Sequence, residues 1–250
     1  MTLEYRRVLP ACGDPPSAPG IVLLHEGLGS MSSWRDFPEA LAQATGRCVV
    51  AYSRQGYGGS DPVAAPRGVD FMHAEAREVL PDLLQALDVA RPVLVGHSDG
   101  ASIALIHAAS GHAVSGLVLI APHVFVEART VEGITAARAA FRTGDLRGRL
   151  ARYHAHPERT FERWCDIWLD PEFRSWNIEA CAAQIEMPML VIQNEDDPYG
   201  TLVQVESIAA RARGPLRTRM TPGRGHAPHV QHREQVLDDI ARFVHREAPA

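Results

Sequence analysis

Ser98 stands at the centre of a five-residue pattern whose first and last positions are glycines. The full pattern is Gly96-His97-Ser98-Asp99-Gly100. A short apolar run at residues 92–95 precedes it and a helix-like run at residues 101–109 follows it, so the order predicts a strand, a sharp turn and a helix. The flanking glycines leave room for the backbone to fold back and expose the hydroxyl of Ser98. The pattern therefore indicates a serine nucleophile.

A serine hydroxyl is a weak nucleophile, so it needs a base to accept its proton and an acid to orient that base. His226 lies in a Gly/Pro-rich segment, residues 221–228, which follows the last expected strand. Glu195, Asp196 and Asp197 follow another expected strand, at the end where open parallel sheets place functional groups. The chain order serine, acid, histidine is the one expected for this architecture.

A reacting carbonyl also needs hydrogen-bond donors that stabilise its developing negative charge. One donor is expected to be the backbone amide of Asp99, because it begins the helix after Ser98, where the helix dipole favours an anion. The loop at residues 25–30, after the first central strand, is expected to supply a second amide.

Strands and helices alternate along the chain, which predicts an α/β fold with a mostly parallel sheet and helices on both faces. The expected parallel strands are short apolar runs without polar alternation, as in strands buried on both faces. They lie at residues 21–24, 48–52, 92–95, 117–120, 189–192 and 216–220, with an antiparallel edge at 4–9. The expected helices lie at residues 34–44, 71–87 with a kink at Pro81, 101–109, 201–212 and 234–245.

Residues 123–186 break this alternation, because they contain helical patterns and no strand candidate. We expect an α/β core at residues 1–122 and 187–250 and a helical cap, or lid, at 123–186. The segment holds three of the four tryptophans. Its aromatic side chains either form a small core of their own or line an apolar pocket, for which Trp164 and Trp168 are candidates.

Together these residues resemble the α/β-hydrolase fold superfamily over residues 21–244. In that family the acid follows a glycine by three positions, which selects Asp197, with Asn194 in the place of the glycine. Asparagine tolerates left-handed backbone angles, so this change is mild. Glu195 and Asp196 remain alternative acids. The run Gly225-His226-Ala227-Pro228 is similarly family-like and selects His226.

The resemblance also extends to the loop at residues 25–30, which in the family often reads H-G-x-L-G-S. Aligned without gaps, Gly27 supplies the second amide; if the glycine is displaced by one position, Leu28 supplies it instead. Glu26 replaces the usual glycine. Its carboxylate either binds nearby loop amides or stands beside the site, where it assists water or selects against anionic groups. The carboxylate of Asp99 could likewise stand beside the site. Alternatively, as an acidic residue in the first turn of a helix, it stabilises the helix dipole.

Other histidines are expected to play supporting parts. His25 and His97 should support the loops around Ser98, and His123 could border the pocket. His154 and His156 are expected to be exposed on the lid. Residues 54–60, which begin at Arg54, resemble a structural loop of the family.

Charge, cysteine spacing and the absence of long apolar runs argue against a nucleic-acid-binding, disulfide-linked or membrane protein. The 250 residues carry a formal net charge of −5, which does not favour nucleic acid as a partner. Cys12, Cys48, Cys165 and Cys181 lack CxxC spacing, and the chain shows neither a signal-peptide pattern nor a membrane-length apolar run. We therefore expect a cytoplasmic protein with reduced thiols and no membrane contact, and the oligomeric state stays open.

No metal or other cofactor is expected. The histidines at 226, 229 and 232 are evenly spaced, but no carboxylate–histidine constellation accompanies them.

The expected chemistry is hydrolysis of a small acyl substrate by water through an acyl-enzyme on Ser98. A carboxylic ester is favoured, because it requires only the three catalytic groups and the amide donors. A serine as the nucleophile of the turn disfavours epoxide and carbon–halogen cleavage, for which the family uses aspartate. Carbon–carbon bond hydrolysis, a lactone or a thioester substrate, and a slowly turning-over ligand sensor remain alternatives.

Overall fold

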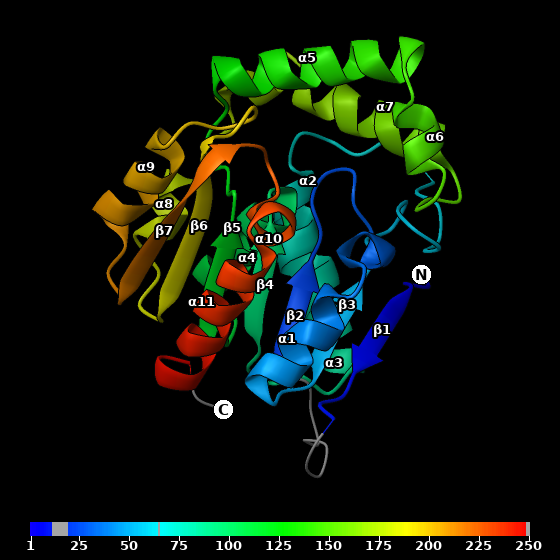
Figure 1. The fold of residues 1–250 in the computed structure, drawn as a ribbon. Helices are drawn as coiled ribbons and strands as arrows, with labels where there is room; N and C mark the ends of the chain where they lie inside the picture. Colours follow the sequence, from blue (N-terminus) through cyan, green and yellow to red (C-terminus); the bar gives the residue numbers. More distant parts are fainter. Residues whose placement is uncertain (12–19, 65, 249–250) are drawn as a thin grey trace.

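A computed structural model describes residues 1–11, 20–64 and 66–248. A single seven-stranded sheet forms its centre, in the order β1-β3-β2-β4-β5-β6-β7, and helices cover both faces (Figure 1). The strands are β1 (Tyr5–Val8), β2 (Ile21–Leu24), β3 (Val49–Tyr52), β4 (Val93–His97), β5 (Gly116–Ile120), β6 (Met189–Asp196) and β7 (Leu216–Arg224). β1 pairs antiparallel with β3, whereas the other neighbours are parallel. The predicted α/β class and its antiparallel edge are confirmed.

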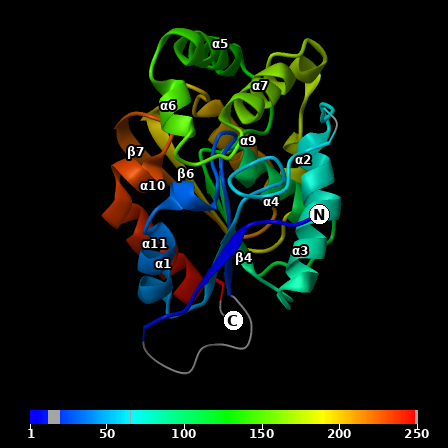
Figure 2. The same ribbon diagram turned by 90° about the vertical axis from the view of Figure 1, so that its right-hand side faces the viewer.

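Alternate residues of the central strands enter two different cores, which explains why these strands show no polar positions. Ile21 and Leu23 of β2 pack on one side of the sheet with α1 (Phe37–Thr45) and α11 (Arg233–Arg246). Val22 and Leu24 face the other side, with α2 (Phe71–Ala74), α3 (Leu80–Ala86) and α4 (Asp99–Ala109). Figure 2 shows the two helical layers on opposite sides of the sheet.

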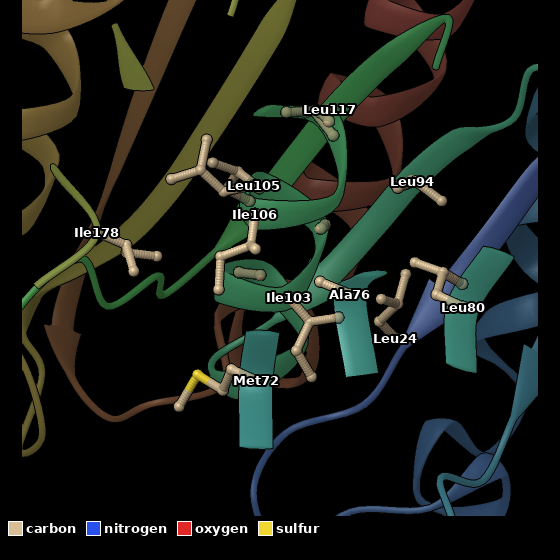
Figure 3. Packing of buried hydrophobic residues seen from close by; sticks show 14 of the residues in the cluster. Leu24, Met72, Ala76, Leu80, Leu94, Ile103, Leu105, Ile106, Leu117 and Ile178 are labelled. Carbon is tan, nitrogen blue, oxygen red and sulfur yellow. The ribbon is translucent and has the colours of Figure 1, made fainter. Parts of the chain in front are cut away.

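Helix α4 is buried along nearly its whole length, because it lies between the sheet and the outer helices. Figure 3 shows Ile103 and Ile106 of α4 near Met72 and Ala76 on one side and near strand residues such as Leu117 on the other. The apolar packing fixes the position of the helix whose first turn follows Ser98.

Two helices differ from the sequence prediction. The helix predicted at residues 34–44 begins three residues later, because Arg35 has a φ of 54° and separates a 3₁₀ turn (Met31–Trp34) from α1. The helix predicted at residues 71–87 contains a π-helical stretch, Glu75–Val79, directly before α3. Pro81 is the second residue of α3 and directly follows this stretch, within a helical backbone that continues unbroken from α2.

Helices α5 (Ala128–Thr143), α6 (Leu146–Leu150) and α7 (Pro157–Trp168) lie beyond the carboxyl ends of the parallel strands (Figures 1 and 2). A 3₁₀ turn (Glu172–Ser175) and α8 (Glu179–Ala182) lead back to β6. Within residues 123–186, which are all described, extended pairing is limited to an isolated bridge between Phe125 and Asn177. The sheet returns with β6, followed by α9 (Val203–Arg211), β7 and α10 (Pro228–Gln231).

Cys12 lies outside the described residues, whereas Cys48, Cys165 and Cys181 are free thiols. Among the described residues, no helix has the length and apolar character needed to cross a membrane.

The turn between β4 and α4 is strained and very tightly packed. Ser98 has a φ of 53°, a conformation that non-glycine residues rarely adopt. A Cβ on Gly96 would collide with the backbone of Gly100, and one on Gly100 would collide with the carbonyl oxygen of Leu24. Both glycines are therefore required by close backbone approach, as their place in the pattern predicts.

Gly100→Ala should lower the free energy of unfolding by about 2 to 3 kcal/mol, because the new methyl group meets rigid backbone. Urea unfolding monitored by circular dichroism measures this change. Gly148→Ala on α6 is the matched control: its Cβ would meet a flexible Asp145 side chain at 3.3 Å, so we expect stability to be unchanged or raised by up to about 1 kcal/mol. Equal stability of the two variants would contradict the packing argument.

Candidate active site

Ser98, His226 and Asp197 form a continuous hydrogen-bonded chain. The Nε2 atom of His226 lies 2.8 Å from the hydroxyl oxygen of Ser98, and its Nδ1 atom lies 2.7 Å from Oδ2 of Asp197. The structure thus brings together three residues that are far apart in the sequence. They come from the turn after β4, the segment after β6 and the loop after β7.

Asp197 is buried and held in the ionised form. Burial alone would raise its pKa, but the charge of His226, the hydrogen bond from that ring and the Tyr199 amide lower the pKa below its ordinary value. The Tyr199 amide donates to Oδ1 at 2.8 Å. An ionised carboxylate only accepts hydrogen bonds, so Nδ1 of His226 carries the hydrogen and Nε2 is free to accept one from Ser98. The alternative acids Glu195 and Asp196 are exposed.

Asn194 fixes the loop that carries His226. Its side-chain amide donates to the carbonyl oxygen of Gly225 at 2.8 Å and to Oε1 of Gln231 at 2.6 Å. The suggestion that asparagine serves here through left-handed backbone angles is wrong, because Asn194 lies within β6 and does not have a positive φ. The side chain, rather than its backbone freedom, is what this position uses.

A cavity of about 570 Å³ opens above Ser98. The sequence-predicted pocket residues Glu26, Leu28, His123, Trp164 and Trp168 all line it, as do Gly27, Ser98, Asp99 and His226. Sequence reasoning missed other lining residues of residues 123–186, namely Thr130, Ile134, Leu146, Arg149, Leu150 and Tyr153. They were missed because periodicity does not show which face of a short helix turns toward a site.

The loop after β2 is closed from above by α7 and by His154. A Cβ on Gly27 would collide with the indole nitrogen of Trp164, so this position requires glycine. His154 donates from Nε2 to the Leu28 carbonyl oxygen at 2.9 Å and accepts at Nδ1 from the Gly58 amide at 3.0 Å. The expectation that His154 is exposed is wrong: it is buried because two loops bind both ring nitrogens, while His156 is exposed.

Arg54 holds the same loop from below. It is fully buried and donates to the carbonyl oxygens of His25, at 2.5 Å, and Glu26, at 2.9 Å. Its backbone amide donates to Nε2 of His25 at 3.0 Å. These contacts agree with the structural role predicted for residues 54–60 and with His25 as a supporting residue. They show in addition that the guanidinium binds the Glu26 carbonyl oxygen, which directly precedes the amide of Gly27.

Comparison with known proteins adds a decisive observation. The model of the alpha/beta hydrolase family matches residues 21–239. The chain belongs to the alpha/beta hydrolase family.

Relatives and solved structures agree with this assignment. The chain is 37% identical over 102 residues to an uncharacterized protein of Mycobacterium tuberculosis, a match that covers 40% of this chain and only 27% of that protein. It is 27% identical over 194 residues to the human serine hydrolase BPHL, covering 73% of this chain and 64% of that protein.

The crystal structure of an enol-lactonase from Burkholderia xenovorans LB400 superimposes with a TM-score of 0.74 at 20% identity, covering 98% of this chain and 96% of that one. At this identity the likeness shows the fold alone.

Two further titratable groups of the protein border the cavity beside Ser98. Burial, followed by the charge of His226, lowers the pKa of His123 to about 3, so its ring is neutral near pH 7. Burial raises the pKa of Asp99 to about 6, against the opposing charge of Arg54. Among the described residues, Oδ2 of Asp99 has no hydrogen-bond partner. Asp99 is 1% exposed and lines the cavity, so it forms part of the site in addition to standing in the first turn of α4.

The three evenly spaced histidines contact different partners. His226 binds Ser98 and Asp197, His229 packs against Trp34 with ring centroids 4.9 Å apart, and His232 lies 2.9 Å from the Pro222 carbonyl oxygen. In the described part of the chain, no group of three or more His, Cys, Asp or Glu side chains is arranged to hold a metal ion.

The buried carboxyl of Asp99 should destabilise the protein at neutral and alkaline pH. Its pKa rises from 3.8 to about 6 on folding, so stability falls as pH rises between these values, by roughly 3 kcal/mol in total. Asp99→Asn removes this cost. Urea unfolding should show the variant roughly 2 to 3 kcal/mol more stable than the parent at pH 8 and equally stable below pH 4.

Asp82→Asn on α3 is the control, because Asp82 is an exposed carboxylate. It should leave the parent's stability unchanged at both pH values. A gain for Asp99→Asn of the same size at pH 8 and below pH 4 would contradict the ionisation argument.

Proposed function

We propose that this hydrolase cleaves a carboxylic ester through an acyl-enzyme on Ser98. The observation that carries the proposal is the hydrogen-bonded chain from Ser98 through His226 to Asp197, at the base of an apolar-walled cavity. This arrangement supports nucleophilic acyl transfer, because Asp197 orients His226 and His226 can accept the proton of Ser98.

In the acylation step, Nε2 of His226 accepts the proton of Ser98 as the serine oxygen bonds to the ester carbonyl carbon. The tetrahedral intermediate collapses when the bond to the alcohol oxygen breaks, and His226 gives its proton to the departing alkoxide. Asp197 stabilises the imidazolium that exists between these events. In deacylation, His226 takes a proton from water, the hydroxide attacks the acyl carbon, and Ser98 recovers its proton as the carboxylic acid leaves.

The oxyanion of each tetrahedral intermediate is assigned to two backbone amides. The amide of Asp99 lies at the first position of α4, where helical N–H groups have no partner within the helix. Gly27, or Leu28 if the register differs by one residue, supplies the second. Gly27 and Leu28 both line the cavity, and Arg54 fixes the carbonyl oxygens of His25 and Glu26, the two residues that precede Gly27. Donors fixed before reaction need no reorganisation as charge develops.

We assign residues 123–186 as a cap over a core formed by 1–122 and 187–250. Ile134, Leu150 and Trp164 give the upper cavity an apolar wall, which suits an uncharged acyl group. An ester needs nothing beyond the three side chains and two amides, so it is preferred over a lactone, a thioester or a carbon–carbon bond. No cofactor takes part in this mechanism.

Ser98→Ala should lower kcat for p-nitrophenyl butyrate by at least about 10³-fold, because the catalytic groups act as a unit. It should also abolish labelling by a fluorophosphonate probe. Ser115→Ala is the control, since that hydroxyl donates to the Arg91 carbonyl oxygen outside the cavity lining. It should keep both the parent rate and the labelling.

The same assay separates the alternatives. Esters of increasing chain length should turn over repeatedly and faster than lactones, thioesters and ring-cleavage diketones. Faster turnover of one of those substrates would replace the ester assignment while keeping Ser98 as the nucleophile. One slow event per molecule would indicate a ligand sensor, and an undiminished rate in Ser98→Ala would refute the mechanism.

A further inference from the structure

His97 stands between a carboxylate and the backbone of the proposed base. Its Nε2 atom lies 2.6 Å from the carbonyl oxygen of His226, and its Nδ1 atom lies 3.4 Å from Oε2 of Glu26. The side chain of His97 is 4% exposed and that of Glu26 is 28% exposed. These contacts join the loop after β2, the residue before Ser98 and the loop after β7.

The chemistry of the two partners determines the charge of the ring. A backbone carbonyl oxygen can only accept a hydrogen bond, so Nε2 of His97 must carry a hydrogen. An ionised carboxylate also only accepts, so the Nδ1 side faces an acceptor as well. A histidine between two acceptors satisfies both only as the imidazolium. The 3.4 Å separation is an ion-pair distance rather than that of a short hydrogen bond.

We propose that Glu26 and His97 form a charged pair that positions His226 against Ser98. Glu26 keeps His97 protonated, and the protonated ring holds the His226 carbonyl oxygen and therefore the backbone from which the imidazole projects. The pair is a positioning device that touches no reacting atom. The inference rests on the proposed function, because it concerns the same base, and it gives Glu26 a role beyond the two considered from sequence.

The groups around His97 leave Glu26 as the carboxylate that contacts it. His229 on α10 packs against its ring at 4.7 Å between centroids, and the ring of His226 lies at 5.1 Å. Asp197 acts on His97 at longer range and binds His226 directly, and the pKa of His123 is lowered partly by the charge of His97. Burial lowers the pKa of His229 well below its ordinary value, so that ring is neutral.

The ionisation directions agree with this geometry. Burial alone would lower the pKa of His97, but the contact and charge of Glu26 raise it above its ordinary value. Burial alone would raise the pKa of Glu26, but His97 holds it well below its ordinary range. The charged form of the positioning contact is therefore complete at acid and neutral pH. As pH rises through the raised pKa of His97, the neutral ring keeps its Nε2–H bond to the His226 carbonyl oxygen but loses the charge that strengthens that bond and the ion pair with Glu26.

Glu26→Gln tests the proposal through the pH dependence of kcat. Without the carboxylate, burial should make His97 neutral at a lower pH, so the alkaline fall in kcat should begin at a lower pH than in the parent. At pH 8, kcat for p-nitrophenyl butyrate should fall roughly 10-fold or more, as expected for a displaced catalytic group, with KM within about twofold. At the acid end of the profile the two proteins should converge.

Four further variants make the test specific. Glu39→Gln is the matched control, because Glu39 is a partly exposed carboxylate paired with Arg6, and it should reproduce the parent profile. Glu26→Asp should restore part of the kcat. The double variant Glu26→Gln/His97→Gln should have the kcat of His97→Gln alone, because Glu26 acts through His97.

Two outcomes would overturn the inference: a Glu26→Gln profile identical to that of the parent, or an equal loss of kcat at every pH together with a lower Tm, which would indicate general loosening. Both leave the proposed function intact as long as Ser98→Ala is inactive. Failure of the proposed function would instead appear as full activity in Ser98→Ala.

Discussion

The close approach of α4 to β2 is the constraint on which the site depends. Gly100 lies so near the carbonyl oxygen of Leu24 that no side chain fits between them. This contact fixes the first turn of α4 beside the loop after β2, so that Ser98 and both predicted amide donors share one small region. The positive φ of Ser98 is held in place by the buried helix behind it. Apolar packing of α4 thus supplies the rigidity that the chemistry requires.

Buried polar contacts then hold each loop around that fixed point. Arg54 binds the loop after β2 from one side, His154 binds it from the segment between α6 and α7, and Asn194 binds the loop of His226. Each of these contacts ends on a backbone carbonyl oxygen, so it positions the backbone whatever side chains surround it. The ionised Glu26 and His97 join two of the loops directly. The carboxyl of Asp99 is buried beside the nucleophile, and this burial lowers the free energy of unfolding when the carboxyl is ionised.

The positions of the strands along the chain and the turn at Ser98 could be predicted from local sequence patterns, and the family resemblance selected Asp197 and His226. Strands buried on both faces are visible as apolar runs, and the turn at Ser98 requires glycines that the sequence displays. The contacts of His154 and the Glu26–His97 pair could not be predicted, because they join residues more than 70 positions apart whose approach depends on tertiary packing. Asn194 shows the same limit: its position was predicted from a turn pattern, but its function lies in a side chain reaching across to another strand's loop.

The central claim is that the hydroxyl of Ser98 becomes acylated during turnover. Rapid acid quench of the hydrolase with excess p-nitrophenyl butyrate, followed by proteolysis and mass spectrometry, tests it most directly. The account predicts that the peptide containing Ser98 gains the mass of one butyryl group within the first turnover, with fragmentation placing it on Ser98. Steady release of p-nitrophenol with no acylated Ser98, or with the acyl group on another residue, would contradict the account.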